Sequence, residues 1–521
     1  MKPGIVGTTG CARVASGHAE TTRAATEVLR AGGNAVDALI AAGWTACVAE
    51  PVFCSPGGGG YALVRPRGRA GLVLDSFAQT PARRRLDGED FFAISGDFGT
   101  DRQEFHIGLG SAAVPGMVAG LFALQRRHAR LPMRELMAPA IALTRDGVEL
   151  NAVQREALCI LEPIVRASDG AAQIFGLDDA AAPLPKLGER VANPALAASF
   201  EALASEGAGL FYHGELAREM AQQSLDRGGH LRLIDFQRYR AHWHRPLYWQ
   251  LGRARIGSNP PPAFGGIMVQ LMTRALERQL PRAARFGSVA HLEALIEAMH
   301  ISEQQRRRLE RPECLKESGQ LMRAFRALDG PVPIVARGTT QISVRDADGN
   351  LAGMTLSNGE GCGRAVPGRG FMLNNMLGEE DLNRLGFGRW PCNRRLASMM
   401  APTVIEHAGR RIVLGSGGSN RIRTAIAQVL CNVMHFGMDL NEAVRAPRLH
   451  LEGQALSVEC SSEAWSEDVF DWLNRHWPEA RHWPRRSLFF GGVHAVSDDD
   501  QAADPRRLGA ACTLDRPGPA G

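Results

Sequence analysis

The chain has 521 residues, of which 45% are hydrophobic and 22% are charged. These proportions are typical of a folded globular protein and exclude a disordered or collagen-like chain. The net charge is only +5, with 60 basic and 55 acidic residues, so no nucleic-acid-binding surface is predicted. No apolar run approaches the roughly 18 residues of a membrane-spanning helix.

The cysteines and the amino terminus suggest a compartment. Ten cysteines are scattered along the chain without a Cys-x-x-Cys pair, which favours reduced thiols and predicts no disulfide. The first residues, Met1 to Gly7, lack the basic segment and apolar run of a signal peptide. A cytoplasmic location is therefore expected.

The first third of the chain predicts buried helices around a glycine-rich turn. Apolar residues lie on one helical face between residues 20 and 29, and Gly32-Gly33-Asn34 end that helix. Residues 35–48 are rich in alanine and almost uncharged, which predicts a second, buried helix. Four glycines at 57–60 precede a predicted strand at 61–64.

The pattern changes at residue 339. Residues 110–145 and 192–310 show mainly helical periodicity, and residues 315–338 are expected to be an exposed linker. After the linker, short β-type runs predict strands at 341–344, 351–355, 403–406 and 411–414, with a helix at about 423–434.

The first two of these strands predict a hairpin. The sequence from Asp346 to Asn350, Asp-Ala-Asp-Gly-Asn, is a strong turn signal. If Asp346 and Asn350 close the loop, Thr339 is paired with Ser357 across the two strands, and other closures shift this register by one residue.

Thr339 has the features of a nucleophile that becomes active when the preceding peptide bond is broken. Its freed α-amine, with an ordinary pKa of about 7.7–8.0, can then act as the general base. Gly338 can adopt a conformation that exposes its carbonyl to the Thr339 hydroxyl, so an acyl shift to an ester can start the cleavage. Gly-Thr-Thr before a strand is also common as plain structure, and the pattern alone leaves that alternative open.

Motifs along nearly the whole chain, in the same order, resemble those of the γ-glutamyltranspeptidase family of N-terminal nucleophile hydrolases. They are His18 to Ala38, Glu50-Pro51, the glycines 57–60, Val114-Pro115-Gly116, Phe211-Tyr212-His213-Gly214, residues 261–266, Thr339 to Val344, Leu373-Asn374-Asn375, residues 400–403, Gly415-Ser416-Gly417-Gly418 and Asp504-Pro505-Arg506.

The resemblance implies an α+β fold, a four-layer αββα sandwich. Residues 1–338 would be the large subunit and residues 339–521 the small one, intertwined in one domain. Thr339 would be the nucleophile, Ser357 the hydroxyl that supports it, and Gly417 and Gly418 the source of the oxyanion hole. An ordinary turn is the alternative for the two glycines. No metal or cofactor is implied.

The sequence departs from the family in the substrate pocket. Phe77 stands where the family has the arginine that binds the substrate carboxylate, and Met376, Met399 and Gly359 replace a glutamine, a serine and an asparagine. Ser398 and an acidic residue at Glu379 or Glu380 remain. A phenylalanine cannot make the charge-assisted bonds of an arginine. Arg364 or Arg369 could compensate, although solvated loop arginines are the simpler interpretation.

Two other groups of residues could bind a metal but are better explained as structural. Glu297 and His300 have the helical spacing of carboxylate-bridged metal sites, of which only one copy occurs, and His242 and His244 could lie on one side of a strand.

The predicted function is hydrolysis or transfer of a γ-glutamyl or related acyl group from a small-molecule amide, after self-cleavage between Gly338 and Thr339. The two fragments would stay together, and further oligomerisation is open. The alternatives are a cephalosporin-acylase-like amidase that acts on a less polar acyl group, and a non-catalytic binding protein. A Ser357→Ala variant is expected to mature but to turn over poorly.

Overall fold

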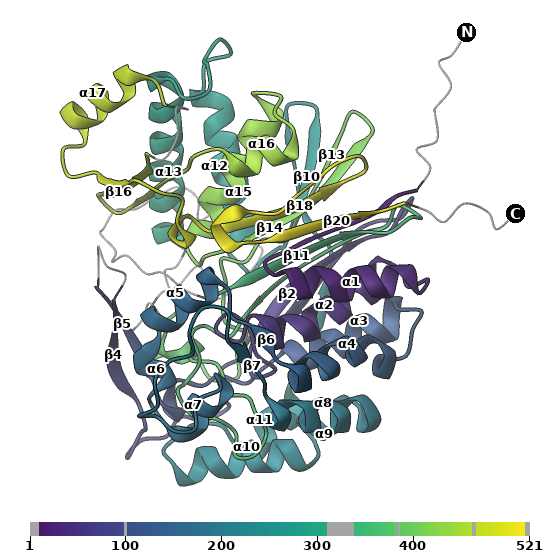
Figure 1. The fold of residues 1–521 in the computed structure, drawn as a ribbon. Coiled ribbons are helices and arrows are strands. Elements are labelled where there is room, and N and C mark those ends of the chain that lie inside the picture. The colour runs from purple at the N-terminus through teal and green to yellow at the C-terminus, as the bar shows by residue number, and fades with distance from the viewer. Residues whose placement is uncertain are drawn as a thin grey trace, which may run out of the picture.

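Two antiparallel sheets lie face to face at the centre of the protein (Figure 1). The computed structural model describes residues 10–97, 102–309, 338–380, 382–383, 386–460 and 465–515. The seven-stranded sheet has the order β20 (Ala510–Leu514), β1 (Ala12–Ser16), β11 (Thr340–Arg345), β12 (Leu351–Ser357), β2 (Gly59–Arg65), β3 (Leu72–Ser76), β8 (His242–His244). The six-stranded sheet has the order β19 (Gln501–Ala502), β18 (Gly492–Ser497), β14 (Arg410–Gly417), β13 (Thr403–His407), β10 (Ala254–Ser258), β9 (Leu247–Leu251).

Apolar side chains between the sheets form one buried cluster. Leu63 and Val73 contribute from the seven-stranded sheet, and Val404 and Val413 from the six-stranded sheet. Both sheets mix strands from before and after residue 338, so neither sheet is complete without both parts of the chain. Two fragments cut at this point would remain joined by their strand pairing.

The outer face of the seven-stranded sheet is covered by α1 (Ala19–Arg30), α2 (Ala35–Ala49) and α3 (Met117–His128), and α4 (Met133–Asp146) packs on α2. All 15 residues of α2 are buried, because this helix packs on β11 and β12 on one side and on α1 and α4 on the other. An alanine-rich, almost uncharged sequence fits such a position, so the prediction of a buried helix at 35–48 is confirmed.

The six-stranded sheet is covered by α12 (Gly265–Gln279), α15 (Arg421–Met434) and α16 (Leu440–Arg445), with α13 (Val289–Leu309) packed on α12. The result is the predicted αββα sandwich (Figure 1). Within the described ranges, no helix has the length and apolar character needed to cross a membrane.

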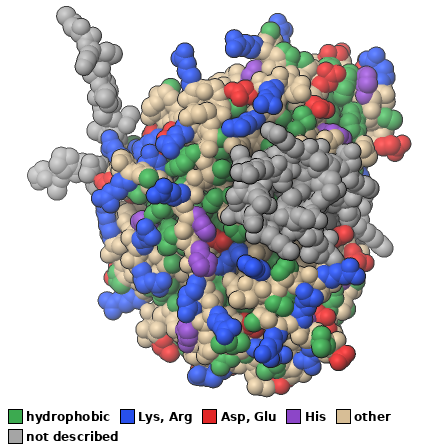
Figure 2. All heavy atoms as spheres, turned by 180° about the vertical axis from the view of Figure 1, so that it is seen from behind, with side chains coloured by type: hydrophobic (Ala, Val, Ile, Leu, Met, Phe, Trp, Pro, Cys, Tyr) green, Lys and Arg blue, Asp and Glu red, His purple; other side chains and the backbone are tan. Residues whose placement is uncertain are grey.

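The remaining elements surround the sandwich. They are β4 (Phe92–Asp97), β5 (Arg102–Ile107), β6 (Val148–Glu149), α5 (Ala152–Ile160), α6 (Glu162–Val165), α7 (Asp169–Ile174), β7 (Arg190–Val191), α8 (Pro194–Glu206), α9 (Ala208–Tyr212), α10 (Glu215–Asp226), α11 (Leu233–Arg238), β15 (Leu449–Glu452), β16 (Ala455–Glu459), α17 (Glu467–His476) and β17 (Arg481–Trp483). On the face shown in Figure 2, basic side chains are scattered across the surface and do not gather in one patch.

The expectation that residues 192–310 are mainly helical is wrong between residues 242 and 258. Three short strands lie there: β8 and β9 are edge strands of the two sheets, and β10 lies between β13 and β9. They have only three to five residues each, which is too short for their alternation to stand out from the helical sequence on both sides. The predicted linker at 315–338 lies outside the described residues except for Gly338.

The motif Asp504-Pro505-Arg506 forms a buried ionic cluster. Asp504 accepts hydrogen bonds from Arg448 Nη2 at 2.7 Å, from Arg506 Nη1 at 3.2 Å and from the Val493 backbone N–H at 2.8 Å. Burial alone raises the pKa of Asp504, but the guanidinium groups of Arg448 and Arg506 outweigh it and hold that pKa well below its usual range. The cluster therefore stabilises the fold at neutral pH.

We expect Asp504→Asn to destabilise the protein by about 3 kcal/mol or more at neutral pH, because it removes the carboxylate that pairs with buried Arg448 and leaves buried Arg506 with Glu459 alone. Since the pKa of Asp504 is lowered on folding, the stabilisation is present above its ordinary pKa and is lost as the pH falls. The difference in denaturant midpoint between the variant and the native protein should shrink in acid. Asp499→Asn, at a largely exposed carboxylate, is the control.

Candidate active site

Thr339 lies directly before β11, in the middle of the seven-stranded sheet. Thr340 pairs with Leu356 and Gln341 with Thr355, a register that continues to Thr339 opposite Ser357. The turn is held by the Asn350 backbone N–H, which donates to Asp346 Oδ1 at 2.8 Å. The predicted hairpin and its register are confirmed.

Two hydroxyl groups converge on the carbonyl oxygen of Gly338. Thr339 Oγ1 donates to it at 2.7 Å and Ser357 Oγ donates to it at 2.6 Å. The Ser357 oxygen accepts a hydrogen bond from the Gly359 backbone N–H at 2.9 Å, which fixes its orientation. Attack of Thr339 Oγ on this carbonyl carbon would place negative charge on the oxygen that the Ser357 hydroxyl already contacts, and such a donor stabilises an oxyanion.

The chain is tightly enclosed at Gly338. A Cβ atom there would lie 2.7 Å from the carbonyl oxygens of both Val52 and Gly359 and 3.2 Å from the Phe53 ring. Contacts below 3.0 Å force something to move, so only glycine fits at this position without a shift. The residue before the nucleophile is thus held between two segments that are far apart in the sequence.

The two hydroxyl contacts revise the expectation for Ser357. We expect Ser357→Ala to slow self-cleavage by about 100-fold or more, the usual cost of losing one oxyanion donor, rather than to mature normally. The measurement is the rate at which the smaller fragment appears after synthesis of the chain. The control is Ser343→Ala. It removes another buried hydroxyl of the same hairpin, which donates to the His494 carbonyl and not to Gly338, so this variant should cleave at the native rate. Equal rates for both variants would contradict a role of Ser357 in cleavage.

The glycine turn at the end of β14 lies against the nucleophile. A Cβ atom on Gly417 would lie 2.1 Å from the carbonyl oxygen of Thr339, and Gly418 has a φ of +110° that side chains rarely allow. The next two residues, Ser419 and Asn420, line the cavity beside Thr339. The close approach to the Thr339 carbonyl explains why residue 417 is a glycine, and the positive φ explains why residue 418 is one. The part of both residues in an oxyanion hole stays a prediction.

A cavity of about 40 Å³ adjoins the two hydroxyl groups. It brings together Thr339, Ser357 and five of the six predicted substrate-binding residues, which are Phe77, Met376, Glu379, Ser398 and Met399. The other lining residues, for which no role was predicted, are Phe264, Leu382, Ala397, Met400, Ser419, Asn420 and Ile422. Several of them lie in or beside the motifs that resemble the family, but only the folded chain shows that they line the same cavity as Thr339.

The lining of this cavity is mostly apolar. Glu379 is its only charged residue among those that the structure describes, and none of the described lining residues is cationic. Gly359 is next to the lining rather than in it, since a Cβ atom there would lie 2.4 Å from Glu379 Oε1 and 2.1 Å from Asn375 Oδ1. A larger side chain at 359 would therefore collide with the cavity wall.

The loop arginines do not compensate for the phenylalanine. Arg364 pairs with Asp90 at 3.2 Å and Arg369 pairs with Glu219 at 2.5 Å, and neither lines the cavity. The possibility that one of them replaces the carboxylate-binding arginine is wrong in this conformation. Each guanidinium is already used by a carboxylate elsewhere.

Behind Phe77 lies a further buried arginine, which is also engaged. The Phe77 ring stacks on Tyr61 with a centroid distance of 5.8 Å. Arg395 donates to the Phe77 carbonyl oxygen at 2.5 Å and lies 3.3 Å from Asp75 Oδ1. Arg395 contacts the backbone side of Phe77 and is absent from the described lining of the cavity.

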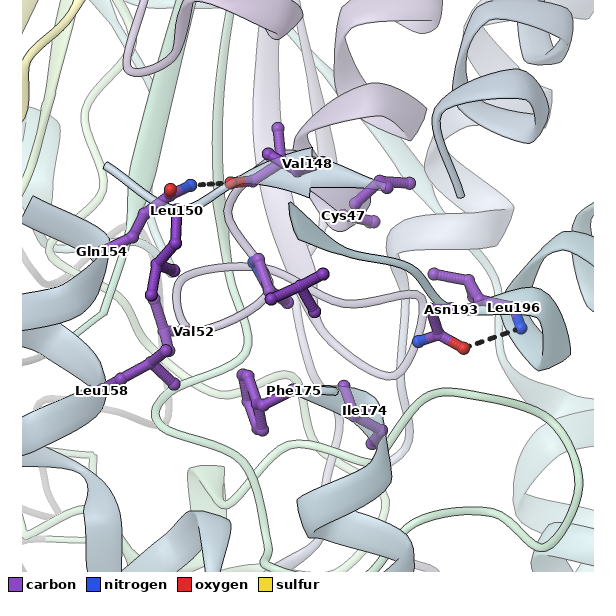
Figure 3. Close-up of a pocket in the computed structure, with 14 residues that line it drawn as sticks. Cys47, Val52, Val148, Leu150, Gln154, Leu158, Ile174, Phe175, Asn193 and Leu196 are labelled. Atoms are coloured by element: carbon purple, nitrogen blue, oxygen red, sulfur yellow. Dashed lines mark hydrogen bonds between the residues drawn. The ribbon is translucent and has the colours of Figure 1, made fainter. Parts of the chain in front are cut away.

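A second cavity, of about 30 Å³, contains none of the predicted site residues (Figure 3). Apolar side chains such as Val52, Leu158 and Phe175 surround it, and its polar residues are already hydrogen-bonded: Gln154 Nε2 donates to the Ala49 carbonyl, and Asn193 Oδ1 accepts from Leu196 N. This cavity is a packing void behind the segment that follows α2.

The other two candidate groups are not joined by further ligands among the described residues. In the described ranges, no three His, Cys, Asp or Glu side chains gather as a metal site would need. His242 and His244 lie on β8 with ring centroids 6.5 Å apart, and Glu297 and His300 lie on α13. The nine described cysteines are free thiols, including the neighbouring Cys47 and Cys54.

Comparisons with known proteins show the family to which the chain belongs. The family model described as Gamma-glutamyltranspeptidase matches residues 21–514. The Glutathione hydrolase proenzyme of Escherichia coli is 27% identical over 477 residues, which cover 84% of this chain and 80% of that protein. The Acylase ACY 1 proenzyme of Pseudomonas sp. (strain V22) is 28% identical over 523 residues, covering 96% and 91%.

Among solved structures, the cephalosporin acylase from Bacillus halodurans has the same fold, with a TM-score of 0.76 and 21% identity over 97% of this chain and 96% of that one. The resemblance drawn from the motifs is thereby confirmed. The chain belongs to the γ-glutamyltranspeptidase family of N-terminal nucleophile hydrolases.

Proposed function

We propose that this protein is made as a precursor that cuts itself between Gly338 and Thr339 and then uses Thr339 to hydrolyse or transfer the acyl group of a small-molecule amide. The observation that carries the proposal is the pair of hydroxyl groups, of Thr339 and Ser357, on the Gly338 carbonyl oxygen. The word proenzyme in the names of both relatives supports it.

In the first stage, Thr339 Oγ attacks the Gly338 carbonyl carbon, the bond from that carbon to the Thr339 nitrogen breaks, and the hydroxyl proton passes to this nitrogen. The products are an ester between the two residues and the free α-amine of Thr339. Water then cleaves the ester, which releases the Gly338 carboxylate and restores the Thr339 hydroxyl. In the second stage, that amine accepts the hydroxyl proton while Thr339 Oγ attacks the substrate carbonyl. The substrate's amine takes this proton and leaves, so that the acyl group is held as an ester on Thr339. The acyl group then passes to water or to an acceptor amine, which restores the Thr339 hydroxyl.

The acyl group that suits this cavity has little charge. A γ-glutamyl group ends in a carboxylate and an ammonium, and buried charges without partners are costly. Phe77, Met376 and Met399 offer such a group only apolar contact. We infer that the preferred substrate is an amide of a less polar acyl group, and the acylase name of one relative supports this.

The test is to trap the acyl-enzyme. The processed protein is mixed with a plain acyl anilide, the reaction is stopped with acid during turnover, and the intact mass of each fragment is measured. We expect the fragment that begins at Thr339 to gain the mass of one acyl group. An acyl group on the larger fragment, or on a residue other than Thr339 when the smaller fragment is digested and its peptides are weighed, would contradict the proposal.

A further inference from the structure

The segment that joins α2 to β2 contacts residues on both sides of the scissile bond. On one side, the backbone carbonyl of Val52 and the ring of Phe53 enclose Gly338. On the other side, Thr340 Oγ1 donates to the carboxylate of Glu50, at 2.9 Å to Oε1 and 3.0 Å to Oε2. Residues 50–53 therefore hold the chain immediately before and immediately after Thr339.

This segment is itself held firmly. Gln154 on α5 donates to the carbonyl of Ala49, the residue before Glu50 (Figure 3). The backbone N–H groups of Phe53 and Cys54 close a turn on the Glu50 carbonyl, at 2.8 and 3.1 Å. A Cβ atom on Gly17 would lie 2.4 Å from Glu50 Oε1, so glycine leaves the space that the carboxylate fills.

The Glu50 side chain faces one cation and is almost fully buried. The Arg507 guanidinium lies over the Phe53 ring at 4.7 Å, and its charge acts on Glu50 and on Glu156. The hydroxyls of Thr21 and Thr340 and the thiol of Cys54 also face the carboxyl group. Burial raises the pKa of Glu50 to about 7, although the hydrogen bond from Thr340 and the charge of Arg507 oppose this.

We propose that Glu50 is a positioning residue for self-cleavage, which keeps the Gly338–Thr339 peptide against Ser357 by holding Thr340. The inference rests on the proposed self-cleavage. Glu50 contacts no reacting atom; it fixes the start of β11 while Val52 and Phe53 fix Gly338 from the other side. Small errors in the placement of reacting groups are known to cost large factors in rate.

The ionisation of Glu50 provides a distinctive signature. Before cleavage the nitrogen of Thr339 is an amide, so the α-amine that serves in later turnover does not exist and cannot titrate. The ionised carboxylate accepts hydrogen bonds only, so both of its oxygens can receive the Thr340 hydroxyl, and it is the form that the charge of Arg507 stabilises. Self-cleavage should therefore become faster as the pH rises through about 7.

The experiment measures the rate of cleavage after a short pulse of cell-free protein synthesis. It compares the native chain with variants of Glu50 and Thr340, the two partners of the hydrogen bond. Glu50→Ala and Thr340→Val are each expected to slow cleavage by about 100-fold. The double variant should be no slower than either single one, because both remove the same contact. Thr340→Ser should restore most of the rate, and Glu50→Gln should remove the rise in rate near pH 7. Glu156→Gln is the matched control and should cleave like the native chain.

The outcomes separate this inference from the proposed function. If the native chain cleaves and both Glu50→Ala and Thr340→Val cleave within about twofold of it, the positioning role is wrong while self-cleavage stands. If the native chain does not cleave, the proposed function fails. If Glu50→Ala aggregates, the cleavage rate of Thr340→Val alone tests the positioning role, since this change only exchanges a hydroxyl group for a methyl group. A rise near pH 7 that persists in Glu50→Gln would contradict the assignment of that ionisation.

Discussion

A Thr339→Ala variant is expected to remain a single chain of 521 residues, whereas the native protein should separate into fragments of 338 and 183 (521 − 338) residues. The reason is that alanine has no hydroxyl group to attack the Gly338 carbonyl, and the Ser357 hydroxyl on the same oxygen serves as a donor rather than as the attacking group. Denaturing electrophoresis gives the fragment sizes, and amino-terminal sequencing of the smaller fragment should begin Thr-Thr-Gln.

Two controls support the assignment. Thr339→Ser keeps a hydroxyl group and should still be cut. Thr355→Val removes a hydroxyl of β12 that donates to Gln341, away from the scissile bond, and this variant should also be cut. If the native chain stays intact after long incubation, the precursor proposal is lost, and the alternative of a non-catalytic binding protein becomes the better account of the fold.

The contacts that could be predicted from the sequence are those set by local geometry. The turn from Asp346 to Asn350 fixes which residues of the two strands face each other, so Thr339 and Ser357 could be paired by counting. The buried helix α2 could be predicted because a helix that packs on both sides has no need of charged residues. Resemblance to a family supplied the pocket residues, and most of them do meet in one cavity.

The contacts that could not be predicted join segments far apart in the sequence. The hydrogen bond from Thr340 to Glu50 spans 290 residues, and no periodicity in either segment signals it. The part that Ser357 takes in self-cleavage depends on the direction of its hydroxyl, which points to the Gly338 carbonyl oxygen. The strands β9 and β10 extend the sheet beyond β13, a strand that follows them by about 150 residues, so their pairing is a property of the folded chain.

The processed enzyme is expected to act on a γ-glutamyl anilide at least about 1000-fold less efficiently, in kcat/KM, than on an anilide of an uncharged acyl group of similar length. Each lost hydrogen bond to a charged group is worth about 1.5–3 kcal/mol, and about 1.4 kcal/mol corresponds to a tenfold change. Three polar partners are absent at Phe77, Met376 and Met399, so their combined effect exceeds three powers of ten even with the nucleophile intact.

Restoring polar groups should change this preference in a predictable direction. Met376→Gln with Met399→Ser should raise kcat/KM for the γ-glutamyl anilide about tenfold or more and should lower it for the uncharged one, because both side chains line the cavity. Phe77→Arg would perturb the protein more. It would place a second guanidinium in a buried region where Arg395 already pairs with Asp75, and it would remove the stacking of Phe77 on Tyr61. Self-cleavage should be unchanged in the methionine double variant, because the scissile peptide is held by Ser357 and by residues 50–53 and not by the substrate cavity. A native enzyme that prefers the γ-glutamyl anilide would show that a charged acyl group finds partners in this cavity, and the proposed preference for a less polar substrate would have to be abandoned.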